Sequence, residues 1–284
     1  MRNLFKAFIF KLRKDLTFRI TLFIGLGISI LMTLIFLGID LGMKALTDDP
    51  SSYKFLMCTG QNLFITSLSP AQNFGIAIPI NLVCFTVLEF SHGTIRNKII
   101  TGNSKTKIYL SLILSGLVFT FALIISYSLL CLALGSIFGG FNINGNAGLT
   151  GGLLNVEYFW RLIVLAVLSY AVITVVAIFF ATLFRNIGPC IPVVIILLMG
   201  CYIFASLVST LGLLGDEVKF IEGAYKASVY FNPIHSVVAN ETNQETGKLF
   251  ISNEAFISEI INNVVYIGLF LTGGLLIFKK RDVK

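Results

Sequence analysis

The sequence predicts an all-α membrane protein that crosses the bilayer several times. Hydrophobic residues make up 56% of the 284 residues and charged residues only 12%, and the mean hydropathy is +0.89. Soluble domains carry roughly 25% charged residues, so this chain could not cover a globule of its size with polar groups. Long apolar stretches recur along its whole length. We therefore expect one polytopic transmembrane domain over residues 1–284.

Six stretches are long and apolar enough to be spans, since a bilayer core requires about 20 apolar residues per helix. The predicted spans are residues 16–39, 62–90, 108–138, 159–184, 188–214 and 257–278. The second contains Pro70 and Pro79, and its first ten residues are only moderately apolar. The fifth has Pro189 and Pro192 in its first turns, where proline is tolerated.

The cations set the orientation of these spans. If the N-terminus, residues 89–107, residues 185–187 and the C-terminal tail share one side, that side holds fifteen of the 21 Lys and Arg residues. Only three of the 14 acids lie with them. By the positive-inside rule this side is cytoplasmic, and an even number of spans places both termini there.

Residues 2–14 before the first span form an amphipathic helix when wound at about 100° per residue. Phe5, Phe8 and Ile9 share one face with Leu4 and Leu12, whereas Lys6 and Arg13 gather with Arg2 on another. Aromatic and cationic faces of this kind suit a helix that lies in the inner membrane interface and contacts lipid. The alternative is a cytoplasmic extension of the first span that carries topogenic charge.

Residues 215–256 form the longest predicted loop, and it is extracellular in this topology. It contains an aromatic turn around Asn232, Pro233 and Ile234. The turn suggests a short element that returns toward the bilayer surface; an ordinary folded loop is the alternative.

Several kinds of chemistry are not expected on this chain. We expect no charge deep in the spans, with Arg161 near a helix end and Asp40 closing the first span, which argues against ion-coupled transport. His92 and His235 fall on opposite sides, so we expect no metal site, no catalytic residue and no enzyme activity. Residues 101–106, TGNSKT, lack the glycine and lysine spacing of a phosphate loop, so no nucleotide site is expected.

The cytoplasmic loop at residues 89–107 is the candidate functional segment. Gly93 permits a sharp turn, Thr94 can cap a helix over Ile95–Thr101, and Gly102 can close that helix. Ile95, Ile99 and Ile100 would form an apolar ridge for a groove of a partner, with Arg96 and Lys98 on other faces. The alternative is a topogenic charge cluster without docking.

Glu89, the run Gly93-Thr94-Ile95-Arg96-Asn97-Lys98, Gly102 and Tyr109 together resemble the coupling loop of ABC transporter type 2 permeases. These are six-span membrane subunits that pair with a separate ATP-binding-cassette ATPase. The resemblance extends to the amphipathic N-terminal helix, both cytoplasmic termini and the Asn232-Pro233-Ile234 outer-loop motif.

The resemblance implies that Gly93–Gly102 docks on the ATPase, with Glu89 at the elbow above it and residues 2–14 also in contact. It implies two ATPase copies that bind ATP and Mg, and a second permease subunit, most simply in a homodimer. The first, second and fifth spans would line the pathway. The compact size resembles bacterial bacitracin-resistance, lantibiotic-immunity and phenol-soluble-modulin exporters, in which an amphipathic peptide or antibiotic leaves across the plasma membrane.

Two other functions stay open at this point. A secondary carrier or channel would act without ATP, and a structural membrane protein would not transport at all. We expect no nucleic-acid partner for any of the three.

Overall fold

The structure is a computed structural model that describes residues 6–7, 9–10, 14, 16–46, 57–70, 77–141, 156–212, 241–242, 249–251 and 253–280. Its helices are α2 (Leu16–Leu46), α3 (Gly60–Leu68), α4 (Ala77–Ser91), α5 (Thr94–Ile100), α6 (Lys105–Gly139), α7 (Val156–Phe184), α8 (Ile187–Gly212) and α10 (Asn253–Lys280). The strands described are β1 (Glu241–Thr242) and β2 (Leu249–Phe250), an antiparallel pair of two residues each. The all-α prediction is confirmed.

Four helices, α2, α6, α7 and α10, are long and apolar enough to cross a membrane. The bent pair α4 and α5 raises the number to five if it counts as one span, and α8 adds a shorter apolar stretch, Ile187–Gly200. These helices make the chain a multi-pass membrane protein.

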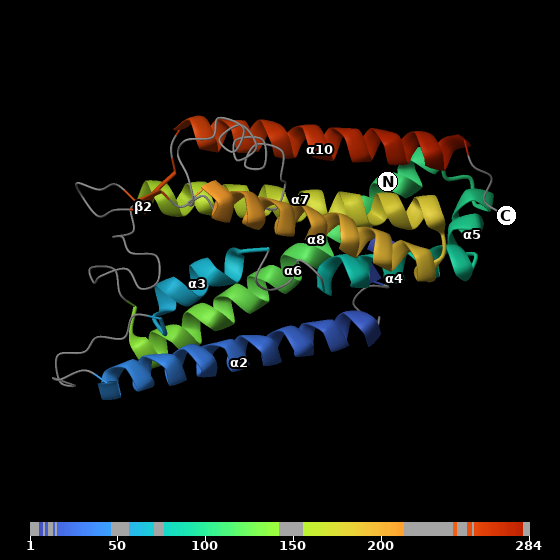
Figure 1. Ribbon diagram of the computed structural model, residues 1–284. Coiled ribbons are helices and arrows are strands. Elements are labelled where there is room, and N and C mark those ends of the chain that lie inside the picture. The colour runs from blue at the N-terminus through green and yellow to red at the C-terminus, as the bar shows by residue number, and fades with distance from the viewer. Residues whose placement is uncertain are drawn as a thin grey trace.

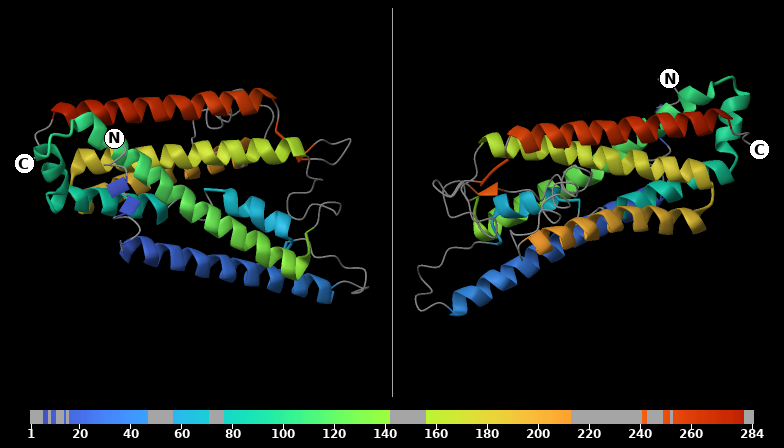
Figure 2. Two further views of the ribbon diagram at one scale, coloured as in Figure 1. Left: turned by 180° about the vertical axis from the view of Figure 1, so that it is seen from behind. Right: turned by 45° about the horizontal axis from the view of Figure 1, so that its top comes forward.

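The long helices lie side by side, with α2 at one edge of the bundle and α10 at the other (Figures 1 and 2). Helix α10 packs mainly on α7, whereas α2 and α3 both pack on α6. Helix α6 runs obliquely, so that one of its ends lies near α5 and α10 and the other near α2 and α3 (Figure 2). This oblique helix joins the two edges of the bundle.

Small residues line the buried face of α2, which packs on α6 and α4. Thr21, Gly25, Ser29 and Thr33 recur every fourth residue and are buried. Such residues let two helices approach closely and form extensive van der Waals contacts. These contacts matter in a membrane because the hydrophobic effect does not drive helices together in lipid. Many large side chains of α2 face away from the protein, as the 70% exposure of Phe23 shows, whereas Phe18 and Phe36 pack against the core. That outer face suits a lipid environment.

The stretch predicted as the second span, residues 62–90, is divided into two helices, α3 and α4. Thr59 caps α3 by accepting a hydrogen bond from the Asn62 amide. The approach to α6 is so close that a Cβ added to Gly135 would lie 2.8 Å from the Cα of Gly60. Ser69 follows α3 and precedes Pro70, and a residue before proline is disfavoured in the helical conformation.

Most of the predicted loops and the N-terminal helix lie outside the described residues. Of residues 2–14, only Lys6, Ala7, Ile9, Phe10 and Lys14 are described, and all five are helical. Phe5, Phe8 and Arg13 lie outside the described part, as do Asn232, Pro233 and Ile234. The interfacial helix and the outer-loop motif therefore stay predictions.

Candidate functional site at the α4–α5 elbow

The segment Glu89–Gly102, called the elbow below, contains the end of α4 and the whole of α5. The two helices are bent by 56° relative to each other. Helix α4 ends at Ser91, and Gly93 follows with φ of 66°. This left-handed conformation favours glycine because it brings a Cβ too close to the following carbonyl oxygen. The short helix α5 then runs across the end of the bundle (Figure 1). The sharp turn predicted at Gly93 is confirmed.

Glu89 joins α4 to α5. Its carboxylate Oε2 accepts a hydrogen bond from Lys98 Nζ at 2.8 Å. Thr94 Oγ1 lies 2.7 Å from the same Oε2 and 2.7 Å from the Glu89 backbone oxygen, and its one hydrogen can donate to either. The Glu89 side chain is 0% exposed and that of Lys98 19%. A buried carboxylate with two such donors holds the two helices in one relative position.

Thr94 has a different role from the one predicted. The N-cap of α5 is Gly93, and Thr94 is the first helical residue. Its hydroxyl turns back toward Glu89, five residues earlier, and therefore does not cap the helix it begins. The hydroxyl acts here as a donor to an oxygen of Glu89, whereas an N-cap hydroxyl would accept a hydrogen bond from a backbone N–H of the helix.

The outer face of α5 also differs from the prediction. Ile95 is fully buried and Ile99 packs against the protein core, so the apolar ridge faces the chain itself. The exposed face carries Arg96, Asn97 and Ile100, the last with 71% exposure. A partner at this face would meet one cation, one amide and one isoleucine.

The C-terminal end of α5 closes on itself. Gly102, at φ of 86°, donates its N–H to the Ile99 oxygen at 2.9 Å. The side-chain nitrogen of Asn103 donates to the Lys98 oxygen at 3.1 Å. The predicted closure by Gly102 is confirmed, and it leads directly to Ser104, which caps α6.

An aromatic cluster lies beneath the elbow. The rings of Phe90 and Tyr109 lie 6.0 and 5.7 Å from the ring of Phe278, which comes from α10. The Arg185 guanidinium lies 5.1 Å from the Phe90 ring centroid, within the range of a cation–π contact. Because residues from α4, α6 and α10 meet here, a movement of the elbow would displace side chains of all three helices.

Among the described residues, three buried charges lie outside the elbow, and their burial was not predicted. Helix α2 continues past Asp40 to Leu46, and the fully buried Asp40 carboxylate accepts from the Met57 and Cys58 amides at 2.9 and 2.7 Å. Arg161 is 9% exposed and donates to the Ile251 oxygen and to Asn253 Oδ1, both at 2.5 Å. It therefore ties α7 to the segment that enters α10.

Glu259 is a buried charge that the sequence analysis did not single out, at the third residue of the predicted span 257–278. It is 3% exposed in α10, and neither carboxylate oxygen has a hydrogen-bond partner among the described residues. Asn263, one turn later, is 1% exposed, and its Oδ1 also lacks a partner there. The spacing of four residues, which places both on one helix face, was visible in the sequence.

The elbow connects α4 to the short helix α5, which crosses the end of the bundle. The described residues hold no His, Cys, Asp and Glu cluster suited to a metal ion. The fold defines a multi-pass α-helical membrane protein. Residues 57–284 match the profile of a family described as a protein of unknown function (DUF2705), and the chain belongs to that family. The searches of curated proteins and of solved structures found no match.

Proposed function

We propose that this chain is the permease subunit of an ATP-driven ABC exporter and that a separate ATPase docks on the elbow. The observation that carries the proposal is the buried contact of Glu89 with Lys98 and Thr94. A force applied to α5 passes to α4 through this contact, because the two helices cannot separate without leaving a buried carboxylate unpaired. Arg96, Asn97 and Ile100 are exposed and available for a partner.

In this proposal the chain has six spans, with α3 and α4 together as the second and α8 as the fifth. Residues 2–14 lie in the inner interface, and both termini are cytoplasmic. Two ATPase copies bind ATP and Mg, and a second copy of this chain completes a homodimer in a bacterial plasma membrane. The exported substrate is an amphipathic peptide or antibiotic.

The test is co-purification of the tagged full chain with ATPase activity from its native membranes. We expect ATPase activity in the wild-type preparation. Gly93→Pro forces φ from the observed 66° to about −65°. The ATPase should then no longer co-purify with the chain. The topology of the variant, measured by cysteine accessibility, should stay unchanged. Arg96→Gln should lower the co-purified ATPase activity, whereas Arg19→Gln, an exposed cation on α2, should not. Wild-type chain that brings no ATPase from native membranes would contradict the proposal.

A second candidate function is a secondary carrier or channel that does not use ATP. Glu259 favours it, since an intramembrane carboxylate without a partner is the usual mark of an ion or proton path. The purified chain alone, in liposomes with an imposed proton gradient, distinguishes the two functions. Solute movement that Glu259→Gln abolishes, with no ATPase present, would replace the exporter proposal.

A further inference from the structure

The cavity between α3, α6 and α7, called the apolar pocket below, has no role in the proposed coupling. Its volume is about 460 Å³, within the range of pockets that hold small organic ligands. Its walls include Phe64 of α3, Ile124 of α6, and Ile163 and Ala166 of α7. None of the described residues that line it is charged. An occupant must therefore be uncharged and mostly apolar, because an ion would lose its hydration without a partner.

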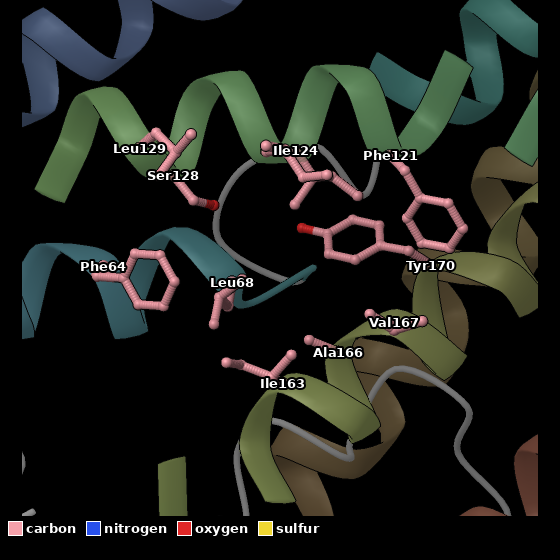
Figure 3. A pocket seen from close by; sticks show the side chains of 11 residues that line it. Phe64, Leu68, Phe121, Ile124, Ser128, Leu129, Ile163, Ala166, Val167 and Tyr170 are labelled. Atoms are coloured by element: carbon pink, nitrogen blue, oxygen red, sulfur yellow. The ribbon is translucent and has the colours of Figure 1, made fainter. Parts of the chain in front are cut away.

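Two hydroxyl groups interrupt these apolar walls. Ser128 and Tyr170 line the pocket, are 3% and 1% exposed, and have no hydrogen-bond partner for Oγ or Oη among the described residues. Figure 3 shows the two hydroxyls pointing from α6 and α7 into the same space. Buried hydroxyls are seldom left without a partner, so this pair indicates a missing ligand atom.

The depth of these hydroxyls narrows the choice of ligand. At 1.5 Å per residue, Ser128 lies about 16 Å from the end of α6 at Gly139, and Tyr170 about 21 Å from the start of α7 at Val156. Both hydroxyls therefore lie in the interior of helices that are long and apolar enough to span a membrane, and not at their ends. Lipid head groups and ester linkages do not reach so far, which leaves a molecule that carries its polar atom within an apolar body.

We propose that the apolar pocket binds an uncharged apolar molecule that has one carbonyl oxygen, held by Ser128 and Tyr170. A carbonyl oxygen has two lone pairs and can accept a hydrogen bond from each hydroxyl. Ile125 and Leu129 line the pocket and are each 56% exposed, so the pocket has an open side through which such a molecule can enter from the lipid. This inference goes beyond the proposed function and does not depend on an ATPase.

The experiment uses the full chain in lipid nanodiscs and two photoreactive probes of equal length. One is a diazirine-bearing long-chain methyl ketone, and the other is the same diazirine chain without the carbonyl. Mass spectrometry of digested protein locates the label. We expect saturable labelling of pocket residues on α6 and α7, with the ketone binding several-fold more tightly than the hydrocarbon.

Variants test whether the two hydroxyls cause the tighter binding of the ketone probe. Tyr170→Phe and Ser128→Ala should each weaken ketone binding about fivefold, the effect of losing one hydrogen bond. Tyr109→Phe is the matched control, because this tyrosine is also buried with an unpartnered hydroxyl yet does not line the pocket. Ala166→Phe should fill the pocket and prevent labelling by both probes.

Two outcomes would overturn the proposal. Equal labelling by the ketone and the hydrocarbon would mean that the hydroxyls hold water or nothing. Ketone binding that Tyr170→Phe leaves unchanged would mean that the label reports the general lipid surface. Tyr170→Phe removes only an unpartnered oxygen, so the variant should fold, and its melting temperature without probe should equal or exceed that of the wild type.

Discussion

The contact between Glu89 and Lys98 makes the sharpest energetic prediction. Glu89→Gln removes the carboxylate charge but keeps an oxygen that can accept hydrogen bonds, so the contact with Lys98 loses its opposite charge. Breaking a fully buried ion pair costs about 3–5 kcal/mol, and an exposed pair is worth less than about 1 kcal/mol. Because the Glu89 and Lys98 side chains are 0% and 19% exposed, we expect about 2 kcal/mol, which is roughly a 30-fold rise in local opening of α5.

Amide hydrogen exchange on the full chain in nanodiscs measures this opening. The amides of Asn97, Thr101 and Gly102 donate to Gly93, Asn97 and Ile99 oxygens at 2.9–3.0 Å, and they exchange only when α5 opens. Their exchange should accelerate roughly 30-fold in Glu89→Gln. Lys107→Met removes an exposed cation from α6 and should leave the rates unchanged.

A double-variant cycle decides whether the ion pair is responsible. Lys98→Met removes the cation that lies beside the buried Glu89 carboxylate and should open α5 at least as much as Glu89→Gln does. The double variant should then be less destabilised than the sum of the two single variants by more than about 1 kcal/mol. Purely additive effects would refute the reasoning, since they would show that the two charges do not stabilise each other.

Three further predictions concern the turn, the buried thiol and the helix contacts. Gly93→Ala should speed exchange in α5 about fivefold, because the left-handed φ of 66° costs alanine about 1 kcal/mol; Gly27→Ala, with open space around it, should not. Burial and a neighbouring carboxylate raise the pKa of Cys58 from 9.0 to about 11. The rate of maleimide labelling at Cys58 should therefore rise about tenfold per pH unit up to pH 11. A rate that levels off near pH 9 would contradict this. The protonated thiol favours the folded state, so its contribution to stability is complete below pH 9 and declines as the pH rises through about 11. Gly135→Ala should destabilise the protein by about 1–3 kcal/mol through overpacking against α3, visible as a lower melting temperature, while Gly268→Ala should have no such effect.

The sequence predicted the long helices well because each is encoded locally. Apolar runs of span length fix α6 and α7 to within a few residues, since hydropathy alone requires a helix in the bilayer. The turn at Gly93 and the closure at Gly102 were predictable for the same reason, because a positive φ depends on the residue at that position.

Contacts between distant segments were not predictable in this way. The direction in which Ile95 faces depends on how α5 rests on the rest of the chain, and this is a tertiary property. The role of Thr94 depends on Glu89 being within reach after the chain bends. The burial of Glu259 likewise follows from the packing of α10 on α7. Helical spacing indicates a shared face but does not reveal what that face contacts.

The placement of α3 has a consequence for biosynthesis. Nine residues of helix extend about 14 Å, well short of the thickness of a hydrocarbon core, so the lipid alone cannot hold α3 at its final depth. Its receiving surface, around Gly135, is translated more than sixty residues later. During synthesis α3 therefore leaves the ribosome before its binding partner exists, and its final position must be taken up after α6 has been inserted.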